Sequence, residues 1–326
     1  MGMGNRAVVV AAVGGAEVLQ VAERDPGVPG AGQLRIRIAA AGVNFIDVYF
    51  RTGLYPRPLP FVAGLEGAGR VEAVGPDVAE FAVGDRVAWA SAPGSYAEAV
   101  VAPAASVVPV PDAVPDDVAA AAMLQGMTAH YLVHAIRPPT AGGTALVHAA
   151  AGGTGLLLVQ MLKAASMRVV GTCGSAEKAA LVREAGADVV VRYDEADFVA
   201  AAREATGGRG VDVVFDGVGR STFDGSLAAL RPRGLLALFG QSSGPVPPFD
   251  LQRLNAGGSL VVTRPSLAHF VATREELRMR ADAVLGAVAR GTLKVRIGAR
   301  FPLADAGDAH RALEGRATTG KVLLIP

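Results

Sequence analysis

The nine residues at 147–155 read VHAAAGGTG and combine residue types that could bind a phosphate group. An apolar strand pattern ends at Val147 and leads into Ala150-x-Gly152-x-x-Gly155, after which an apolar helical pattern begins at once. Glycines let the backbone approach a pyrophosphate closely, and the N-terminus of a helix offers unpaired N–H groups and a partial positive charge. The pattern therefore indicates a dinucleotide-binding turn. Because Ala150 replaces the first glycine, a plain glycine-rich turn is an equally good interpretation of the motif alone.

The end of the next predicted strand indicates which dinucleotide would bind. An NAD site usually carries an acidic residue about 20 residues past the first glycine, on the ribose 2′-hydroxyl. Here residues 171–178 read GTCGSAEK, so small and hydroxyl residues take that place. Ser175 can donate a hydrogen bond to a 2′-phosphate, Lys178 adds positive charge, and Glu177 can point to solvent on a helix. We therefore expect NADPH, with an ordinary helix start and a solvated lysine as the alternative.

A second group of polar residues could line a substrate pocket. Asn44, Asp47 and Tyr49 fall close together on one predicted turn, and Tyr55 follows in the sequence GLYP. Polar side chains in an apolar, loop-rich segment are typical of a pocket lining. They also serve as turn formers and core-edge aromatics, and by themselves the residues favour that structural interpretation.

The pattern of predicted strands and helices that must position these residues changes along the chain. Up to about residue 115 the sequence is rich in turns and short strand patterns, which predicts a small β-barrel. The strand patterns are Arg6–Ala12, Leu34–Ala41, Gly67–Val74 and Asp85–Ala90. The boundary of this module is expected near residues 115–126.

In the middle of the chain strands and helices alternate, which predicts a parallel, doubly wound sheet. The predicted strands are Ala145–His148, Arg168–Thr172, Asp188–Val191, Val211–Phe215 and Leu235–Phe239, and the helices are 155–165, 175–185, 195–206 and 222–230. After about Ser266 the alternation stops. A capping box at Thr273 opens a helix to about Arg290, and a strand is predicted over Gly320–Ile325. We expect this tail to pack back on the first module.

Length and composition limit the class of protein. The 326 residues are 51% hydrophobic and carry a formal net charge of +1, so two domains with ample core are expected and neither nucleic acid nor a membrane is indicated as a partner. The N-terminus lacks the pattern of a secretion signal, and no apolar run of about 18 residues could span a membrane. Cys173 is the only cysteine, which excludes an intrachain disulfide and fits a reducing cytosol. We therefore expect a cytoplasmic protein.

Over nearly its whole length the chain resembles the zeta-crystallin-like quinone oxidoreductases of the medium-chain dehydrogenase/reductase superfamily. The resemblance rests on motifs that occur in the family's order: Asn44-Phe45-Ile46-Asp47, Arg51-x-Gly53-Leu54-Tyr55-Pro56, Gly64-x-Glu66-x-Ala68-Gly69, His148–Gly155, Thr263–Leu267 and Arg316-Ala317-Thr318. It implies a GroES-like β-barrel catalytic domain and a Rossmann domain with a doubly wound parallel sheet, hence an α/β protein. It also implies NADPH as cofactor, quinone as substrate and a dimer. Residues 1–124 and 266–326 would form the catalytic domain and residues 125–265 the NADPH-binding domain.

The metal question separates this group from the related alcohol dehydrogenases. Those enzymes place a cysteine near the position of Asn44 and a Gly-His-Glu motif on the barrel, whereas this chain has Leu65 in place of the histidine. Catalytic zinc generally needs three protein ligands, so we expect no zinc. His130 and His134 have helical metal spacing but lack a third ligand, and a solvated or packed pair is expected. His148, His269 and His310 are each expected to have structural or surface roles.

The resemblance assigns the site residue by residue. Asn44, Tyr49 and Tyr55 resemble the nicotinamide- and quinone-site residues, and Gln125 and Thr128 resemble the segment beside the cofactor, where the family often has lysine at the position of Gln125. The pyrophosphate would bind Ala151, Gly152, Gly153, Thr154 and Gly155. The adenosine 2′-phosphate would bind Gly174, Ser175, Lys178, Tyr193 and Arg316, and the nicotinamide ribose Phe239, Gly240 and Ser242. Arg264 stays without a role.

The expected function is an NADPH-dependent, zinc-independent quinone reductase that works in a cleft between the domains, with hydrogen bonds in place of a metal to polarise the substrate. A tyrosine or water could supply the proton, and the transfer could be one hydride or two single electrons; the sequence does not choose between these alternatives. One alternative is an enone or enal reductase acting on α,β-unsaturated carbonyls. Another is an NADPH-responsive RNA-binding or structural protein. The apolar strand near residues 259–263 is expected to be an exposed sheet edge that pairs with a second copy in a homodimer.

Overall fold

The protein is described here by a computed structural model that covers residues 5–326. The chain forms two compact units. Unit 1 combines the described chain up to Met127 with Val271–Pro326, and unit 2 is Thr128–Phe270. Because the first of these units is built from both ends of the sequence, its two segments must pair with each other to complete it.

Unit 1 contains a seven-stranded and a three-stranded sheet. In the larger sheet the strand order is β15-β16-β3-β5-β6-β8, and β7 pairs with β3; in the smaller one it is β2-β1-β4. The strands are β1 Arg6–Val10, β2 Leu19–Glu23, β3 Gln33–Val43, β4 Phe61–Val62, β5 Glu66–Val74, β6 Arg86–Trp89, β7 Ala99–Pro103, β8 Val107–Pro109, β15 Ile297–Pro302 and β16 Lys321–Ile325. The α-helices that lie wholly in the described part of unit 1 are α1 Phe45–Arg51, α8 Arg274–Ala289 and α9 Ala306–Glu314.

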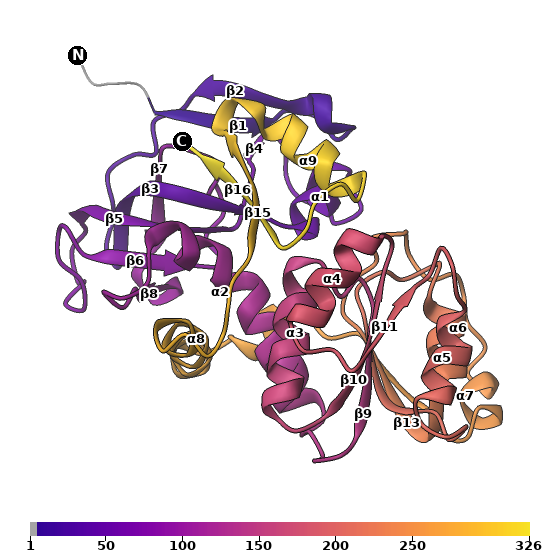
Figure 1. Cartoon of the computed structure of the whole chain (residues 1–326). Helices are drawn as coiled ribbons and strands as arrows, with labels where there is room; N and C mark the ends of the chain where they lie inside the picture. Colours follow the sequence, from indigo (N-terminus) through magenta and orange to yellow (C-terminus); the bar gives the residue numbers. More distant parts are fainter. Residues whose placement is uncertain (1–4) are drawn as a thin grey trace. The chain divides into compact units, whose positions relative to one another are not determined.

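The C-terminal strand completes the larger sheet of unit 1. β16 runs antiparallel to β3, with Leu323 opposite Gly42, and Figure 1 shows the yellow end of the chain beside the indigo one. In the first half of β3, buried residues alternate with more exposed ones, as a strand with one face on the core requires. Trp89, Tyr96, Leu34 and Ile36 are among the largest fully buried side chains on which the two sheets pack.

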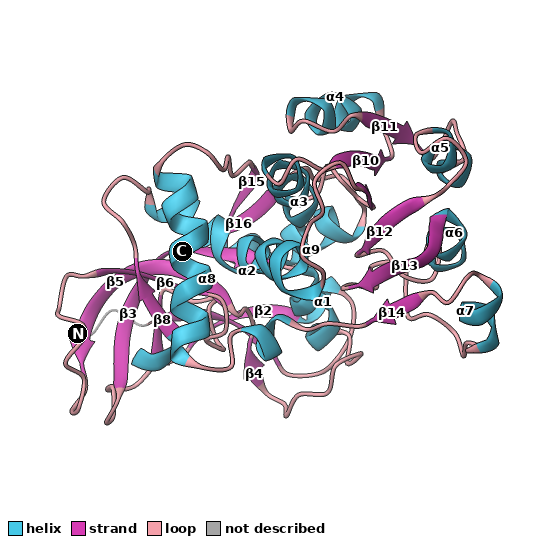
Figure 2. Cartoon of the chain, turned by 90° about the horizontal axis from the view of Figure 1, so that it is seen from below, coloured by secondary structure: helices cyan, strands magenta, loops and turns pink. Residues whose placement is uncertain are grey.

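Unit 2 is a six-stranded parallel sheet with the order β11-β10-β9-β12-β13-β14. Its strands are β9 Thr144–Val147, β10 Arg168–Cys173, β11 Val189–Arg192, β12 Val211–Asp216, β13 Leu230–Leu238 and β14 Val261–Thr263. Its helices are α3 Gly153–Ala164, α4 Ala176–Glu184, α5 Phe198–Glu204, α6 Phe223–Ala229 and α7 Gln252–Ala256, and they lie on both faces of the sheet (Figure 2). The predicted doubly wound parallel sheet is confirmed. Its strand order reverses between β9 and β12, which is the switch point where such sheets bind ligands.

Several element boundaries differ from the predicted ones for local reasons. α5 begins at Phe198, not at 195, because Asp197 caps it by accepting a hydrogen bond from the Val199 amide. The strand expected near 259–263 begins at Val261, since Ser259 has a positive φ of 57°. The helix α2, Asp116–Tyr131, continues into a π-helical turn at Leu132–Ile136 and contains the boundary between the units. None of the helices in residues 5–326 is long and apolar enough to cross a membrane.

Candidate active site

The glycine-rich turn of unit 2 connects β9 to α3 at the switch point of the sheet. Ala149 has a positive φ of 48°, and the Gly152 amide donates to the Ala149 carbonyl at 2.9 Å. A Cβ on Gly155 would lie 2.4 Å from that same carbonyl oxygen, so no larger residue fits there without a shift of the backbone. The turn therefore needs a glycine at 155 for close packing of the helix on the strand.

The first turn of α3 offers the groups that an anion needs. Gly152 is the N-cap, and the Leu156 amide donates to the Gly152 carbonyl at 2.9 Å. The N–H groups that precede Leu156 in the helix have no partner within it, and the helix dipole adds partial positive charge at the same place. Residues 151–155 thus fit a pyrophosphate, as the sequence predicts.

The end of β10 has the small and hydroxyl residues expected beside a 2′-phosphate. Ser175 caps α4, since its hydroxyl accepts a hydrogen bond from the Lys178 amide at 3.2 Å. A Cβ on Gly174 would lie 2.4 Å from the Tyr193 hydroxyl, so the glycine leaves room for that ring, which is 47% exposed. Glu177 is exposed. Ser175, Lys178, Gly174 and Tyr193 therefore gather around one strand end.

The segment after β13 is held by the turn after β12. The Phe239 amide donates to the Asp216 carbonyl at 2.9 Å and the Ser242 amide to the Gly217 carbonyl at 3.2 Å. A Cβ on Gly240 would lie 2.6 Å from the Gly217 carbonyl oxygen. This close backbone packing fixes Phe239, Gly240 and Ser242 at the carboxyl end of the sheet.

Buried side chains brace the same end of unit 2. His148 lies 3.0 Å from the hydroxyls of both Thr172 and Ser226, and the Ser226 hydroxyl donates to Asp216 at 2.8 Å. The Phe198 ring packs edge-on against the imidazole with 4.7 Å between centroids. Burial lowers the pKa of His148. A neutral, hydrogen-bonded imidazole has a structural role here, as expected from the sequence.

In unit 1, Asn44 is the N-cap of the short helix α1, which contains Tyr49, and Tyr55 follows this helix. The rings of Tyr49 and Tyr55 lie 5.1 Å apart, because the Tyr55 amide donates back to the Tyr49 carbonyl at 3.0 Å. Phe45 and Phe50 pack against these rings at 6.0 and 5.9 Å. The structure thus brings both tyrosines together in one aromatic cluster beside Asn44.

Asn44 itself belongs to a buried ionic group. Its Nδ2 donates to Glu66 at 2.7 Å and to the Gly42 carbonyl at 3.3 Å, while its Oδ1 accepts from the Lys321 ammonium at 2.7 Å. Lys321 also pairs with Glu66, and both side chains are buried. The second Glu66 oxygen accepts from the Leu124 amide at 2.7 Å. Both side-chain amide hydrogens of Asn44 and its Oδ1 are therefore engaged inside the unit.

A second chain of buried polar groups starts from the other side of α1. The Tyr96 hydroxyl donates to Asp47 Oδ2 at 2.9 Å, and His310 Nε2 lies 3.2 Å from that hydroxyl. His310 Nδ1 faces Arg51 Nη1 at 3.5 Å, so the imidazole accepts at Nδ1 and donates at Nε2. Burial and the charge of Arg51 lower the pKa of His310 to about 3. The sequence predicts a structural or surface role for His310, and the fold gives it the structural one by burying it in this chain of polar groups.

Asp47 is the least satisfied carboxylate of the chain of groups. Its Oδ2 accepts from the backbone N–H of Asn44 and from the Tyr96 hydroxyl, whereas its buried Oδ1 has no hydrogen-bond partner in the described structure. Burial raises the pKa of Asp47 to about 7, against the hydrogen bonds and the charge of Lys321 that lower it. Asp47 therefore holds its proton up to a far higher pH than an ordinary carboxyl group does.

Three expected cofactor residues belong to segments other than the strand ends of unit 2. Gln125 is on α2 in unit 1, and its buried Oε1 has no hydrogen-bond partner in the described structure. Such an orphaned acceptor fits a donor group of a ligand. Thr128 is buried on the part of α2 that belongs to unit 2. Arg316 is exposed in unit 1, after α9, with a positive φ of 57°. It thus belongs to a different unit from Ser175, Lys178 and Tyr193.

No group of three or more metal-ligating side chains occurs in residues 5–326. The rings of His130, near the end of α2, and His134, in the π-helical turn that follows, lie 4.7 Å apart and form a packed pair.

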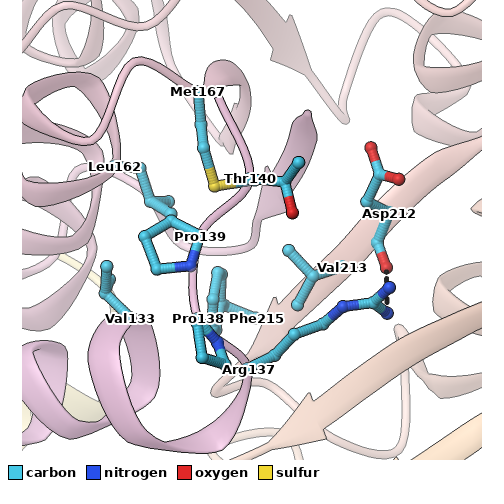
Figure 3. Close-up of a pocket in the computed structure, with 10 residues that line it drawn as sticks. All are labelled: Val133, Arg137, Pro138, Pro139, Thr140, Leu162, Met167, Asp212, Val213 and Phe215. Atoms are coloured by element: carbon cyan, nitrogen blue, oxygen red, sulfur yellow. Dashed lines mark hydrogen bonds between the residues drawn. The ribbon is translucent and has the colours of Figure 1, made fainter. Parts of the chain in front are cut away.

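A small pocket of unit 2 lies at the amino ends of the strands, whereas the glycine-rich turn lies at their carboxyl ends. Figure 3 shows Thr140, which precedes β9, together with Asp212 and Val213 near the start of β12, so the pocket opens at the amino ends of these strands. Arg137 donates to the Asp212 carbonyl at 3.3 Å and closes one side. The pocket is therefore separate from the expected cofactor residues of unit 2.

Comparison with known proteins agrees with this arrangement. Residues 30–112 match the alcohol dehydrogenase GroES-like domain and residues 153–282 match the zinc-binding dehydrogenase family. A quinone oxidoreductase from Pseudomonas aeruginosa is 45% identical, with 97% of this chain and 98% of that protein covered. A 2-haloacrylate reductase from a Burkholderia species is 41% identical, with 98% of each covered. The crystal structure of Escherichia coli quinone oxidoreductase complexed with NADPH superposes with a TM-score of 0.96 at 42% identity, covering 98% of this chain and 100% of that one.

The fold and site define a medium-chain dehydrogenase/reductase with a GroES-like domain and a Rossmann domain, so the expected fold class is confirmed. Within that superfamily the chain belongs to the quinone oxidoreductase family.

Several residues of the site had no sequence signal of their own. Lys321 and His310 are 277 and 214 positions from the partners Asn44 and Tyr96. A polar residue inside an apolar strand pattern, as Lys321 at the start of Lys-Val-Leu-Leu-Ile, was the one available sign of a buried partner.

Proposed function

We propose that this chain is an NADPH-dependent quinone reductase that works without zinc. The proposal is carried by one observation: over nearly its full length the chain has the fold and the motif order of quinone oxidoreductases, one of them solved in complex with NADPH. The absence of a fixed carboxylate at the end of β10, where Ser175 caps α4, supports NADPH over NADH.

The proposed cofactor contacts are those that the sequence predicts, and the glycine-rich turn and strand ends of unit 2 support most of them. Ala151, Gly152, Gly153, Thr154 and Gly155 bind the pyrophosphate, and Gly174, Ser175, Lys178 and Tyr193 bind the 2′-phosphate, with Arg316 supplied by unit 1. Phe239, Gly240 and Ser242 bind the nicotinamide ribose, and Gln125 and Thr128 lie beside it. The reduced nicotinamide supplies a hydride, and the substrate takes a proton in addition to become a hydroquinone.

Substrate binding is assigned to the aromatic cluster of unit 1. Tyr49 and Tyr55 provide ring surface for a quinone and hydroxyls for its carbonyl oxygens. Asn44 acts as the anchor of α1, because its amide hydrogens are bound by Glu66 and Gly42 and its Oδ1 accepts from Lys321. Where a zinc site would need a histidine, Leu65 is present, and the positive charge beside Glu66 is the Lys321 ammonium.

The test is oxidation of NADPH and of NADH, measured with a quinone and with an enone as acceptor. Quinone turnover with NADPH and little with NADH is expected. Turnover of neither acceptor by protein that binds NADPH would overturn the proposal and favour a non-catalytic role.

A second function is favoured by one relative. The name 2-haloacrylate reductase denotes a substrate whose carbon–carbon double bond is conjugated to a carboxyl group, and the Burkholderia protein is 41% identical to this chain. The same hydride geometry would reduce an α,β-unsaturated carbonyl. Turnover of enones with no turnover of quinones would make this alternative the correct one.

The finer expectations on assembly and location are also proposals. β14 lies at one end of the sheet order and Val261 is 48% exposed, which supports edge-to-edge pairing of two copies near 259–263. Sedimentation of a single 33.1 kDa species would overturn the dimer. A single buried thiol, Cys173, supports a cytoplasmic location.

A further inference from the structure

Arg57 is a half-buried arginine held only by aromatic rings. Its guanidinium carbon lies 4.7 Å from the centre of the Phe61 ring and 5.4 Å from that of Phe50. Within residues 5–326 no side chain or backbone group forms a hydrogen bond or an ion pair with it. Its five N–H donors are therefore left for water or a ligand, while the rings fix the plane of the group.

A nearby arginine, Arg51, has a carboxylate partner, so the lack of one at Arg57 is not general to the arginines of this segment. Arg51, six positions earlier on the same segment, donates two hydrogen bonds to Glu314 at 2.8 and 2.9 Å. Arg57 has no such carboxylate. The nearest acidic influence on it is the charge of Asp47, which opposes the lowering of the Arg57 pKa by burial. Because burial raises the pKa of Asp47 to about 7, that negative charge is incomplete at neutral pH.

Arg57 is connected to the substrate residues by a continuous run of rings. Phe50, which contacts the guanidinium, packs edge-on against Tyr55 at 5.9 Å, and Tyr55 packs against Tyr49 at 5.1 Å. Arg57 also follows Tyr55 by only two positions in the chain. A molecule held by Tyr49 and Tyr55 would thus have the planar guanidinium of Arg57 nearby, with only the Phe50 ring between Tyr55 and that cation.

We propose that Arg57 forms an anion subsite of the substrate pocket and that the preferred substrates carry a carboxylate next to the reducible quinone or enone. A guanidinium fork pairs with a carboxylate through two parallel hydrogen bonds, and partial removal from water strengthens such a pair. The inference rests on the proposed function, since it takes Tyr49 and Tyr55 as substrate contacts.

The test compares a 1,4-benzoquinone that bears a carboxylate side chain with its methyl ester, which has nearly the same shape and no charge. The enzymes are the wild type, Arg57→Gln, Arg57→Lys and the control Arg24→Gln, an exposed arginine of the same unit. For Arg57→Gln we expect kcat/KM for the acid to fall about tenfold or more, mainly through KM, and that for the ester to stay within about twofold. Arg57→Lys should restore part of the loss, and Arg24→Gln should change neither.

Binding of the corresponding hydroquinones to the NADP⁺-loaded protein, measured by calorimetry, gives a readout that does not depend on turnover. Tighter binding of the acid than of the ester, lost in Arg57→Gln, supports the subsite. Equal binding of the two compounds by the wild type overturns it, as does an equal loss for acid and ester in Arg57→Gln, because Arg57 would then only brace its loop. Failure of the wild type to reduce any quinone or enone would instead count against the proposed function, whatever the binding result.

Discussion

The proposed cofactor site of unit 2 consists mainly of backbone groups, whereas the proposed substrate site of unit 1 consists mainly of side chains. Around the glycine-rich turn the chemistry is carried by backbone N–H groups, and the constraint is the space that a side chain would fill, as at Gly155. Around α1 it is carried by buried side chains, above all Glu66 and Lys321, which depend on each other for charge balance. The backbone site should therefore fail through steric clash, and the side-chain site through loss of a partner.

The largest effect is expected from breaking the buried pair in unit 1. Lys321→Met leaves the Glu66 carboxylate buried without its cation and removes the donor to Asn44 Oδ1. Removal of one member of a buried pair costs about 3–5 kcal/mol of unfolding free energy. Denaturant-induced unfolding of the variant measures that loss.

Two further variants sharpen this result. Adding Glu66→Gln to Lys321→Met removes the unpaired charge and keeps an acceptor for the Leu124 amide, so part of the stability should return. Lys163→Met breaks an ion pair with Asp188 whose side chains are each about one-third exposed, and should cost only about 0–1 kcal/mol. If Lys321→Met costs no more than Lys163→Met, the buried pair does not hold unit 1 together.

Gly155→Ala should disrupt the glycine-rich turn by adding an atom that does not fit, rather than by removing a partner. The added Cβ would lie 2.4 Å from the Ala149 carbonyl oxygen and 2.7 Å from the Ala150 Cα, so the start of α3 must move away from the turn. We expect about 1–3 kcal/mol of overpacking and an NADPH dissociation constant raised about tenfold. Both can be measured by unfolding and by titration with NADPH.

The matched control for this substitution is Gly286→Ala on α8 of unit 1. There the nearest atom to an added Cβ is Arg290 Nη1 at 3.1 Å, the flexible end of a side chain. This variant should gain up to about 1 kcal/mol because alanine favours a helix. Unchanged NADPH affinity in Gly155→Ala would show that the turn does not bind the pyrophosphate.

A smaller and more selective effect is expected at Ser175. Ser175→Asp keeps a good N-cap on α4, so stability should hold, but it places a carboxylate where the 2′-phosphate is expected. Loss of a charge-assisted hydrogen bond is worth about 1.5–3 kcal/mol, so NADPH affinity should fall at least about tenfold while NADH affinity does not. The reverse exchange at another cap of unit 2, Asp197→Ser, should leave both affinities unchanged. An equal loss for the two cofactors in Ser175→Asp would rule out a 2′-phosphate contact at this position.

The same contrast explains what the sequence could predict. The turn after β9 is specified by residues within one short stretch, so strand, glycines and helix predict both its fold and its ligand. Tyr49 and Tyr55 were within reach for the same reason. The partners of Asn44 and Tyr96 are Lys321 and His310. They reach α1 only because β16 pairs with β3 and α9 packs against β16. No local pattern encodes such long-range contacts, and Arg57 likewise became notable only once its lack of a partner was visible.

The last prediction separates two opposing titrations inside unit 1. Burial raises the pKa of Asp47 to about 7, above its ordinary value of 3.8, so the folded protein holds a proton that the unfolded chain releases between these values. Its contribution to stability is fully present below about pH 4 and is lost as the pH rises toward 7. Burial lowers the pKa of His310 from 6.5 to about 3, so its contribution is present above pH 6.5 and is lost as the pH falls.

Between about pH 4 and 6.5 the two slopes, each up to about 1.4 kcal/mol per pH unit, have opposite signs and largely cancel. Asp47→Asn should remove one of them and leave stability that rises with pH, and His310→Gln should leave stability that falls with pH. Unfolding free energies measured at several pH values across this range test both. Parallel pH profiles for the two variants would contradict the assignment, because burial shifts the pKa values of Asp47 and His310 in opposite directions.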